Sequence, residues 1–228
     1  MKISIVANQN ESDGGLVLGA LASENPHVSI HYREEPRSWP STSGADLVVS
    51  LGSSWSVYWD NVATNVDAES AFIRHIVSRG IPFLGICFGA QMLSCAFGGK
   101  VERAKKAEIG WHDVGTIEGS APLGGRWMQW HFDSFSAPAG FETLAINDAG
   151  IQAIRRGRSL GVQFHPEATE AIVTRWMEGD GARELAALGL SPSALLSETS
   201  QETVRTPRAT AELVGWFLES IAQSPFLV

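Results

Sequence analysis

The segment 82–93 constrains the fold of this chain more than any other. An apolar run there leads through Gly85-x-Cys87-x-Gly89 directly into a helical pattern. Glycines on both sides of a cysteine allow the backbone to turn sharply from a strand into a helix, which places the cysteine at the tip of a nucleophile elbow. The free N–H groups at the start of such a helix favour a thiolate over a thiol. The pattern therefore predicts a buried strand, a following helix and a nucleophilic Cys87.

The other cysteine, Cys95, has no such turn around it and falls within the same helical pattern. A cysteine in these surroundings usually packs as a small hydrophobic residue, so we expect a structural role for Cys95. Two cysteines cannot build a disulfide framework, and they form no CxxC pair that would hold zinc or undergo redox cycling. The chain also lacks GxxxxGK[ST] and GxGxxG loops. We therefore expect neither a metal site nor a cofactor.

Strand-like and helical patterns alternate through the first half of the chain, which is typical of strand–helix units on a parallel sheet. The strands of this part are predicted at 2–6, 28–32, 46–51 and 82–86. The expected fold is α/β: a three-layer α/β/α arrangement with a mostly parallel central sheet. A chain of 228 residues suits one domain spanning 1–228.

The pattern changes after residue 100 to short, closely spaced strands. These predict a small antiparallel patch joined to the main sheet. Its strands are expected at 101–118, 127–130, 142–147, 151–154 and 160–164.

Helix boundaries can be predicted from capping signals. Thr64 and Asp67 have the spacing of a capping box and predict the start of a helix that ends before Gly80. Thr206 precedes a proline, which is the order expected for an N-cap and the first helical residue. Two further helices are predicted, one at 169–177 and a short one within 182–188.

A cysteine nucleophile needs a base, and the base needs a group that orients it. The apolar run 161–164 ends in His165-Pro166-Glu167, which places an imidazole and a carboxylate at the end of a buried strand. Burying either group alone would be unfavourable, so the pair is expected to interact. The sequence thus predicts that His165 and Glu167 act with Cys87.

Together, these segments resemble the class I (triad) glutamine amidotransferases. The chain most resembles the stand-alone branch of that family, which is similar to the amidotransferase domain of GMP synthase. The resemblance covers about 46–169 and is carried by the motifs at 85–91 and 164–167, with further matches at 51–54, 108–111 and 130–135. It implies a flavodoxin-like fold and an enzyme that hydrolyses the side-chain amide of glutamine.

The resemblance also implies a mechanism. The Cys87 thiolate would attack the amide carbon and form a γ-glutamyl thioester. His165 would transfer protons during release of ammonia and attack of water, while Glu167 holds the imidazole ring.

Substrate-binding residues follow from the same resemblance. Backbone N–H groups of Phe88 and of the Gly52-Ser53 turn would stabilise the oxyanion. The amino-acid end of the substrate would be bound by Gln91 and by the backbone around Trp130, His131 and Phe132.

The sequence departs from the family pattern at three positions. Ser53 replaces a second glycine in the oxyanion turn, and its β-carbon is expected to restrict the orientation of the peptide there. Phe132 stands where glycine is frequent and is expected to narrow or reshape the pocket. Ala90 replaces a frequent histidine, a change we expect to be tolerated.

Three functions remain open from the sequence. The first is a glutaminase that passes ammonia to a separate synthetase subunit, since the chain has no nucleotide-binding loop. The second is a γ-glutamyl peptidase or hydrolase, for which Phe132 and nearby tryptophans would suit a bulkier leaving group. The third is a catalytically silent binding subunit that has kept the fold.

Charge and hydropathy exclude other classes of function. The chain carries 17 Lys and Arg against 25 Asp and Glu, a formal net charge of −8. This argues against nucleic acid or an anionic membrane as the main partner. The apolar run at 3–6 is too short for a signal peptide, and no segment approaches the roughly 20 apolar residues of a membrane span. We expect a cytoplasmic protein.

Overall fold

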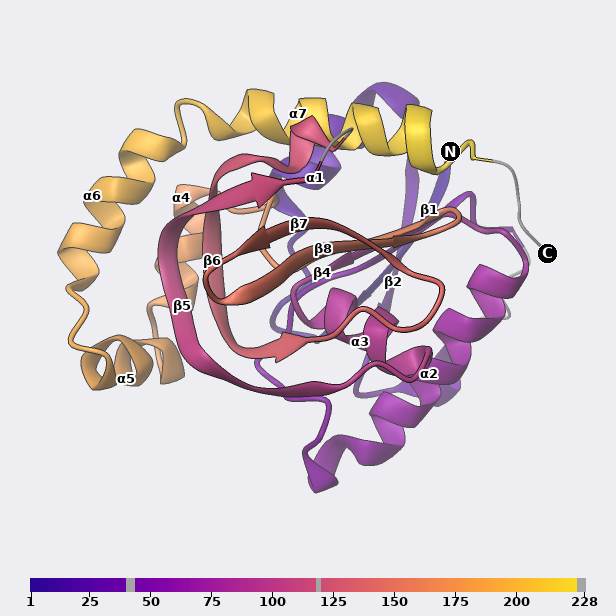
Figure 1. Ribbon diagram of the computed structural model, residues 1–228, viewed down its shortest axis with the longest axis horizontal. Coiled ribbons are helices and arrows are strands. Elements are labelled where there is room, and N and C mark those ends of the chain that lie inside the picture. The colour runs from indigo at the N-terminus through magenta and orange to yellow at the C-terminus, as the bar shows by residue number, and fades with distance from the viewer. Residues whose placement is uncertain (40–43, 118–119, 225–228) are drawn as a thin grey trace.

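The computed structural model describes residues 1–39, 44–117 and 120–224. Within these residues, nine strands form one mixed sheet in the order β2-β1-β3-β4-β9-β8-β7-β5-β6 (Figure 1). The first five strands in this order run parallel to one another. They are β2 (His27–Tyr32), β1 (Lys2–Ala7), β3 (Leu47–Ser50), β4 (Phe83–Ile86) and β9 (Ser159–Val162).

The other four strands extend the sheet in antiparallel fashion. They are β8 (Gly150–Arg156), β7 (Glu142–Asn147), β5 (Val101–Thr116) and β6 (Gly125–Phe135). The long strands β5 and β6 pair along most of their length, whereas β5 joins β7 only through Gly115 and Thr116. The β5–β6 ribbon therefore curls away from the plane of the parallel strands, as Figure 1 shows.

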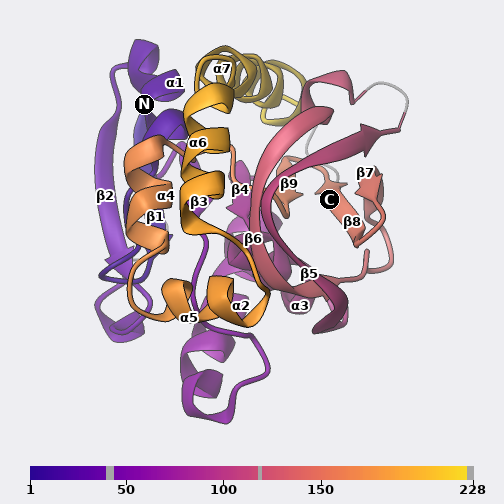
Figure 2. The ribbon, with the colours of Figure 1, turned by 90° about the vertical axis from the view of Figure 1, so that its left-hand side faces the viewer.

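Helices cover both faces of the parallel strands (Figure 2). One face carries α1 (Gly15–Ala20) and α7 (Thr206–Trp216), and the other carries α2 (Ala63–Ser78) and α3 (Phe88–Ala96). Strands β3, β4 and β9 are buried along their whole length because both of their faces are covered.

Alternate residues of one strand enter separate apolar clusters. Ile5 packs in the cluster that contains Leu213 of α7, whereas Val6 packs in the cluster that contains Ile73 of α2. This alternation fixes which face of the sheet each helix covers.

A third group of helices lies beside the β5–β6 ribbon (Figures 1 and 2). It consists of α4 (Glu170–Trp176), α5 (Asp180–Ala187) and α6 (Pro192–Glu202). Val173, Leu185 and Leu195 of these helices pack against Trp111 and Met128 of the ribbon. Short helical turns complete the described fold at Leu21–Glu24, Pro36–Ser38, Asp60–Val62, Ala121–Leu123 and Phe217–Ile221.

The expected α/β class and parallel sheet are confirmed, but the antiparallel part is not a small patch. Four of the nine described strands belong to it, and β5 alone has 16 residues. The three-layer description fits only the parallel half of the sheet. A register shift between Arg103 and Glu108, together with Gly110 at φ +113°, lets β5 bend into a long curled strand.

Two predicted N-caps are wrong. Helix α2 begins at Ala63 without a side-chain cap, because the 3₁₀ turn at Asp60–Val62 has already wound the chain before Thr64. Helix α7 includes Thr206 as its first residue, and Arg205 occupies the N-cap position. The predicted end of α2 is confirmed, since Gly80 follows the helix with φ +67°.

Two other predictions need revision. Strand β5 ends at Thr116, and Glu118, the last residue of the predicted strand, lies outside the described residues. The short helix expected within 182–188 is α5, but the sequence analysis missed α6. Ser191 caps α6 by accepting the N–H of Ala194, and Pro192 opens the helix.

Candidate active site

Cys87 occupies the sharp turn between β4 and α3. Its backbone has φ +51° and ψ −106°, a conformation that non-glycine residues rarely adopt. The Cys87 N–H donates to the carbonyl of Val162 at 2.8 Å, and the N–H groups of Ala90 and Gln91 donate to the Cys87 carbonyl. The expected elbow is therefore present, with the cysteine at its tip.

Both flanking glycines are required by close backbone contacts. A β-carbon on Gly85 would lie 2.5 Å from the carbonyl oxygen of Gly89. A β-carbon on Gly89 would lie 2.1 Å from the carbonyl oxygen of Ser50 on β3. The Gly-x-Cys-x-Gly spacing thus reflects packing of the elbow against the neighbouring strand.

His165 and Glu167 follow β9 and meet beside Cys87. The imidazole Nδ1 lies 2.7 Å from Oε1 of Glu167, and both side chains are buried. A β-carbon built on Gly52 would lie 3.1 Å from Cε1 of His165 and 3.8 Å from Cβ of Cys87, which places both residues next to the same turn. Among the described residues, His165 Nε2 has no hydrogen-bond partner.

The charges around His165 favour its protonated form. Burial of the ring opposes protonation, but the carboxylate of Glu167 and the sulfur of Cys87 outweigh this effect and raise the pKa of His165 well above its ordinary value. The arrangement places a protonated imidazole beside the Cys87 sulfur.

Gln163 is a neighbour of Cys87 that was not predicted from the sequence. Its Nε2 donates to the Cys87 sulfur at 3.4 Å, and its Oε1 lies 3.4 Å from Nε2 of Gln91. Gln163 precedes His165 by two residues and lies in the bend that follows β9. Its place beside His165 at the end of that strand is the signal that could have identified it.

A cavity of about 570 Å³ contains this cluster, and it is formed mainly by three parts of the chain. These parts are the loop before α1, the turn after β3, and helices α4 and α5. The predicted residues that line the cavity are Cys87, His165, Glu167, Gly52, Ser53 and Trp130.

Acidic side chains predominate among the charged residues of the cavity wall. Burial raises the pKa of Glu11, although the N–H of Ser54 donates to its carboxylate and partly offsets this effect. Arg175 also lines the cavity but is paired with Asp13 at 2.5 Å. The other carboxylates that line it belong to Glu178, Asp180 and Glu184.

The side chains of His131 and Phe132 contact other residues and do not line the cavity. His131 bonds to Glu108 through Nε2 at 3.1 Å and to the Asp133 carbonyl through Nδ1 at 3.0 Å. Phe132 lies against the guanidinium of Arg103 at 4.4 Å. The expected role of the backbone at these residues stays a prediction.

Phe88 and Gln91 also lie outside the cavity wall. Phe88 contributes a backbone N–H in the first turn of α3, where helical N–H groups lack an acceptor within the helix. The side chain of Gln91 is linked to the Cys87 sulfur through Gln163. Trp130 places its carbonyl oxygen 3.9 Å from the Cys87 sulfur.

Trp176 was also missed, since no sequence signal connects it with the elbow. Its ring lies 4.6 Å from the His165 ring and 6.0 Å from the Trp130 ring. The Trp130 indole N–H donates to Glu184 at 2.7 Å, which links β6 to α5 at the cavity wall. Helices α4 and α5 therefore complete one wall of the site.

The described residues hold no group of three or more His, Cys, Asp or Glu side chains arranged to bind a metal ion. His112 Nδ1 lies 3.6 Å from Oε1 of Glu108, but Glu108 is also bound by His131 and Asn147. Burial tends to raise the pKa of Glu108, but these hydrogen bonds lower it below its ordinary value. Across the same described residues, none of the helices has the length and apolar character needed to span a bilayer.

The sequence profile of the family described as glutamine amidotransferase class-I matches residues 59–172, which is half of the chain. The chain belongs to this family. The resemblance predicted from the motifs is thus confirmed, and the matched residues include Cys87, His165 and Glu167.

The curated relatives of this class I amidotransferase chain include GMP synthases described as glutamine-hydrolyzing. The enzyme of Pyrobaculum aerophilum is 39% identical over 193 residues, which cover 82% of this chain and 37% of the relative. The enzyme of Aquifex aeolicus is 31% identical over 134 residues, which cover 54% of this chain and 26% of the relative. The chain therefore matches only about a quarter to somewhat over a third of the length of these relatives.

A solved structure supports the assignment to the family over almost the whole chain. A glutamine amidotransferase from Thermotoga maritima superposes with a TM-score of 0.85 at 26% identity and covers 96% of this chain and 99% of its own. The similarity thus extends well beyond the segment matched by the family profile.

Proposed function

We propose that this chain hydrolyses the side-chain amide of glutamine, with Cys87, His165 and Glu167 as its catalytic triad. The observation that carries the proposal is the strained Cys87 beside the buried His165–Glu167 pair, at the wall of a cavity. Membership of the class-I family supports glutamine as the substrate. The arrangement matches the general logic of nucleophile, base and orienting group.

The reaction would proceed through a covalent thioester. The Cys87 thiolate attacks the amide carbon, the C–N bond breaks, and the departing nitrogen takes a proton from the His165 imidazolium to leave as ammonia. Neutral His165 then removes a proton from water, whose oxygen attacks the thioester carbon and releases glutamate. Glu167 holds Nδ1 and stabilises the imidazolium throughout.

Two backbone N–H groups are proposed to stabilise the oxyanion that forms on the amide oxygen. One belongs to Phe88 in the first turn of α3, and the other to Ser53 in the turn after β3. Fixed donors of this kind are among the largest contributions to acyl transfer.

The two cysteines provide a direct test. We expect release of glutamate and ammonia from glutamine by the unmodified chain, and a loss of at least about 10⁴-fold in kcat for Cys87→Ala, because removal of a nucleophile leaves only binding and oxyanion contributions. Cys95→Ala is the matched control and should keep its activity, since Cys95 lies on α3 away from the cavity. Equal activity of both variants would contradict the proposal.

A second candidate function, hydrolysis of γ-glutamyl conjugates, is favoured by the size and charge of the cavity. A volume of about 570 Å³ is typical of sites for molecules larger than a free amino acid. The carboxylates of Glu11, Glu178 and Glu184 favour a leaving amine that carries a second, positive group.

This candidate predicts a ranking of substrates. We expect kcat/KM for a γ-glutamyl diamine to exceed that for γ-glutamyl-glutamate by about tenfold, because the carboxylates attract the cationic leaving group by up to about 1 kcal/mol and also repel the anionic one. Glu178→Gln should reduce the difference, whereas an exposed carboxylate on α7, tested as Glu212→Gln, should leave it unchanged. A preference for the anionic conjugate would contradict this prediction.

For the glutaminase function, we propose that ammonia passes to a separate synthetase polypeptide. The GMP synthase relatives support a coupling of this kind. A candidate synthetase should use glutamine only when this chain is present and use free ammonia without it. If neither glutamine nor any conjugate were turned over and Cys87 resisted thiol reagents, the chain would instead be a catalytically silent binding subunit.

A further inference from the structure

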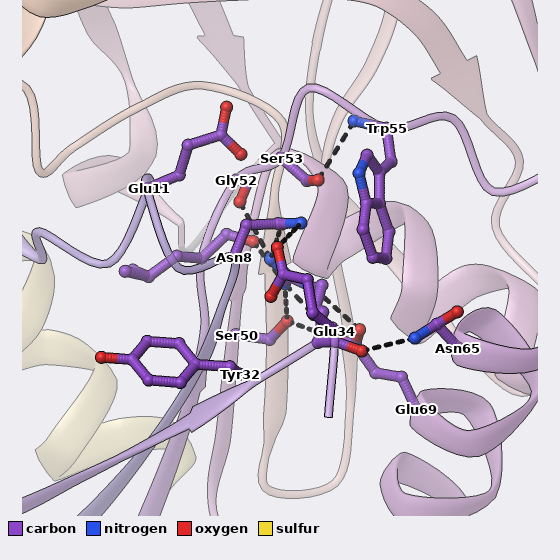
Figure 3. Close-up of polar contacts among 12 residues, drawn as sticks. Asn8, Glu11, Tyr32, Glu34, Ser50, Gly52, Ser53, Trp55, Asn65 and Glu69 are labelled. Carbon is purple, nitrogen blue, oxygen red and sulfur yellow. Dashed lines mark hydrogen bonds and ion pairs between the residues drawn. The ribbon is translucent and has the colours of Figure 1, made fainter. Parts of the chain in front are cut away.

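A buried arginine lies directly beneath the turn that follows β3. Arg33 comes immediately after β2, and its side chain is only 1% exposed. Figure 3 shows the polar groups that gather around this position, among them Asn8, Ser50, Gly52 and Glu69. Among these residues, only the Gly52–Ser53 turn has a role in the proposed catalytic steps; Arg33 itself has none.

Every donor nitrogen of the Arg33 guanidinium is used. Nε donates to Glu69 at 2.8 Å, and Nη2 donates to both Glu69 and the Ser50 hydroxyl. The other contacts go to the Asn8 side chain at 3.0 Å and to the carbonyl oxygens of Leu51 at 2.8 Å and Gly52 at 3.0 Å. The guanidinium therefore holds two successive carbonyl groups of the turn.

The contact with Gly52 determines the orientation of the next peptide bond. In a planar trans peptide the C=O and N–H groups point in opposite directions. Because the Gly52 carbonyl is held towards buried Arg33, the N–H of Ser53 is directed away from it, towards the side on which Gly52 approaches His165 and Cys87. Ser53 has no positive φ, and its hydroxyl accepts the N–H of Trp55 at 3.1 Å.

The same guanidinium contacts the second expected oxyanion donor. Its central carbon lies 4.8 Å from the centre of the Phe88 ring, and Phe88 supplies the first N–H of α3. Arg33 thus touches both segments that would bind the oxyanion, although it does not itself line the cavity.

We propose that Arg33 is a positioning residue for the oxyanion site and that it fixes the Gly52–Ser53 peptide with its N–H towards the reacting carbonyl. This inference rests on the proposed cysteine acyl-transfer function. It also explains how a serine can occupy the turn: the orientation of the peptide is set by the guanidinium, not by the freedom of a second glycine.

A role in stability alone explains the cluster poorly. Removing an arginine and a glutamate from water is unfavourable, and well-packed apolar residues often stabilise a core at least as well as a buried ion pair. An apolar side chain could not hold the two carbonyl groups. Lysine would also be a poor substitute, because it lacks the planar set of donors that reaches several acceptors at once.

The test measures the rate of acyl transfer and the reactivity of the Cys87 thiol separately. Arg33→Lys and the double variant Arg33→Met/Glu69→Gln are compared with the unmodified chain; the double variant leaves no unpaired charge in the core. Three rates are measured: glutamine hydrolysis, hydrolysis of p-nitrophenyl acetate, and alkylation of Cys87 by iodoacetamide. Alkylation forms no oxyanion on an attacked carbonyl, so it reports only the nucleophile and its base.

We expect both variants to lose about 10²-fold or more in kcat for acyl transfer, the usual effect of losing one oxyanion donor, with KM for glutamine changed less than about threefold. Alkylation should stay within about threefold of the unmodified rate. Ser50→Ala is the matched control, because it removes one partner of the guanidinium and keeps the Gly52 contact; it should lose little activity.

Unchanged rates of acyl transfer in the folded variants would overturn the proposal. A parallel loss of acyl transfer and of alkylation would overturn it too, and so would failure of both variants to fold. The rate of p-nitrophenyl acetate hydrolysis distinguishes failure of the Arg33 proposal from failure of the proposed glutamine hydrolysis. If the unmodified chain hydrolyses the ester but not glutamine, the assignment of the substrate fails while the role of Arg33 is still decided. If it hydrolyses neither, both proposals fail.

Discussion

His165 couples the chemistry of the site to the stability of the fold. Its pKa in the folded chain is raised well above the ordinary value, because the charges of Glu167 and Cys87 outweigh the effect of burial. The folded chain therefore binds this proton more tightly than the unfolded chain does. The resulting stabilisation is complete below the ordinary histidine pKa of about 6.5 and is lost as the pH rises through the folded pKa.

Replacing the carboxylate should reveal this linkage. We expect Glu167→Gln to lower the pKa of His165 and to lower the free energy of unfolding most at about pH 6, with a smaller difference as the pH rises. Denaturant unfolding at a series of pH values, together with NMR titration of the imidazole, measures both effects. Glu170→Gln, an exposed carboxylate on α4, serves as the control. A stability difference that grew with pH would contradict the assignment.

At the scale of elements, the position of α3 is restricted by close contact with β3. It starts at the elbow, and its second residue, Gly89, lies against the backbone of β3. Because Gly89 has no side chain, the first turn of α3 can pack directly against the backbone of β3, next to Cys87.

Two glycine-to-alanine changes should have opposite effects. Gly89→Ala would place a β-carbon 2.1 Å from the Ser50 carbonyl oxygen, so we expect a loss of about 1–3 kcal/mol in the free energy of unfolding. Gly215→Ala on α7 meets no atom within 4 Å and should stabilise the chain by about 0.5–1 kcal/mol through helix propensity. Thermal and denaturant unfolding of both variants checks the pair, and equal effects would contradict this account of the elbow.

The elements that could be predicted from the sequence are those with local signals. The elbow around Cys87 and the end of α2 at Gly80 follow from glycine geometry, and His165 and Glu167 follow from their place at the end of an apolar strand. The starts of α2 and α7 could not be located from a capping residue, because neighbouring turns wind the chain earlier. The start of α6 at Ser191 carried a local signal that was overlooked.

The wall of the cavity could not be predicted, because it depends on packing between distant segments. Trp176 and Glu184 reach the site only when α4 and α5 pack against the β5–β6 ribbon. Arg33 reaches the Gly52–Ser53 turn because β2 and β3 lie on either side of β1. Neither relation has a signature in the spacing of residues along the chain.

On the scale of the whole molecule, the shared apolar clusters predict that 1–228 behaves as one cooperative unit. Residues of β1, β9 and α7 meet in a single cluster, although these elements lie far apart in the sequence. We expect far-ultraviolet circular dichroism and the fluorescence of the eight tryptophans to report the same thermal transition. Two separate transitions would show that the ribbon and its helices form an independent domain.

The backbone conformation of Cys87 lowers the stability of the chain. Holding a non-glycine residue at φ +51° and ψ −106° costs roughly 1–3 kcal/mol, a sizeable part of the stability of a typical domain. Glycine would relieve this strain at once but would remove the thiol. Stability and the proposed turnover therefore place opposite demands on the residue at this position.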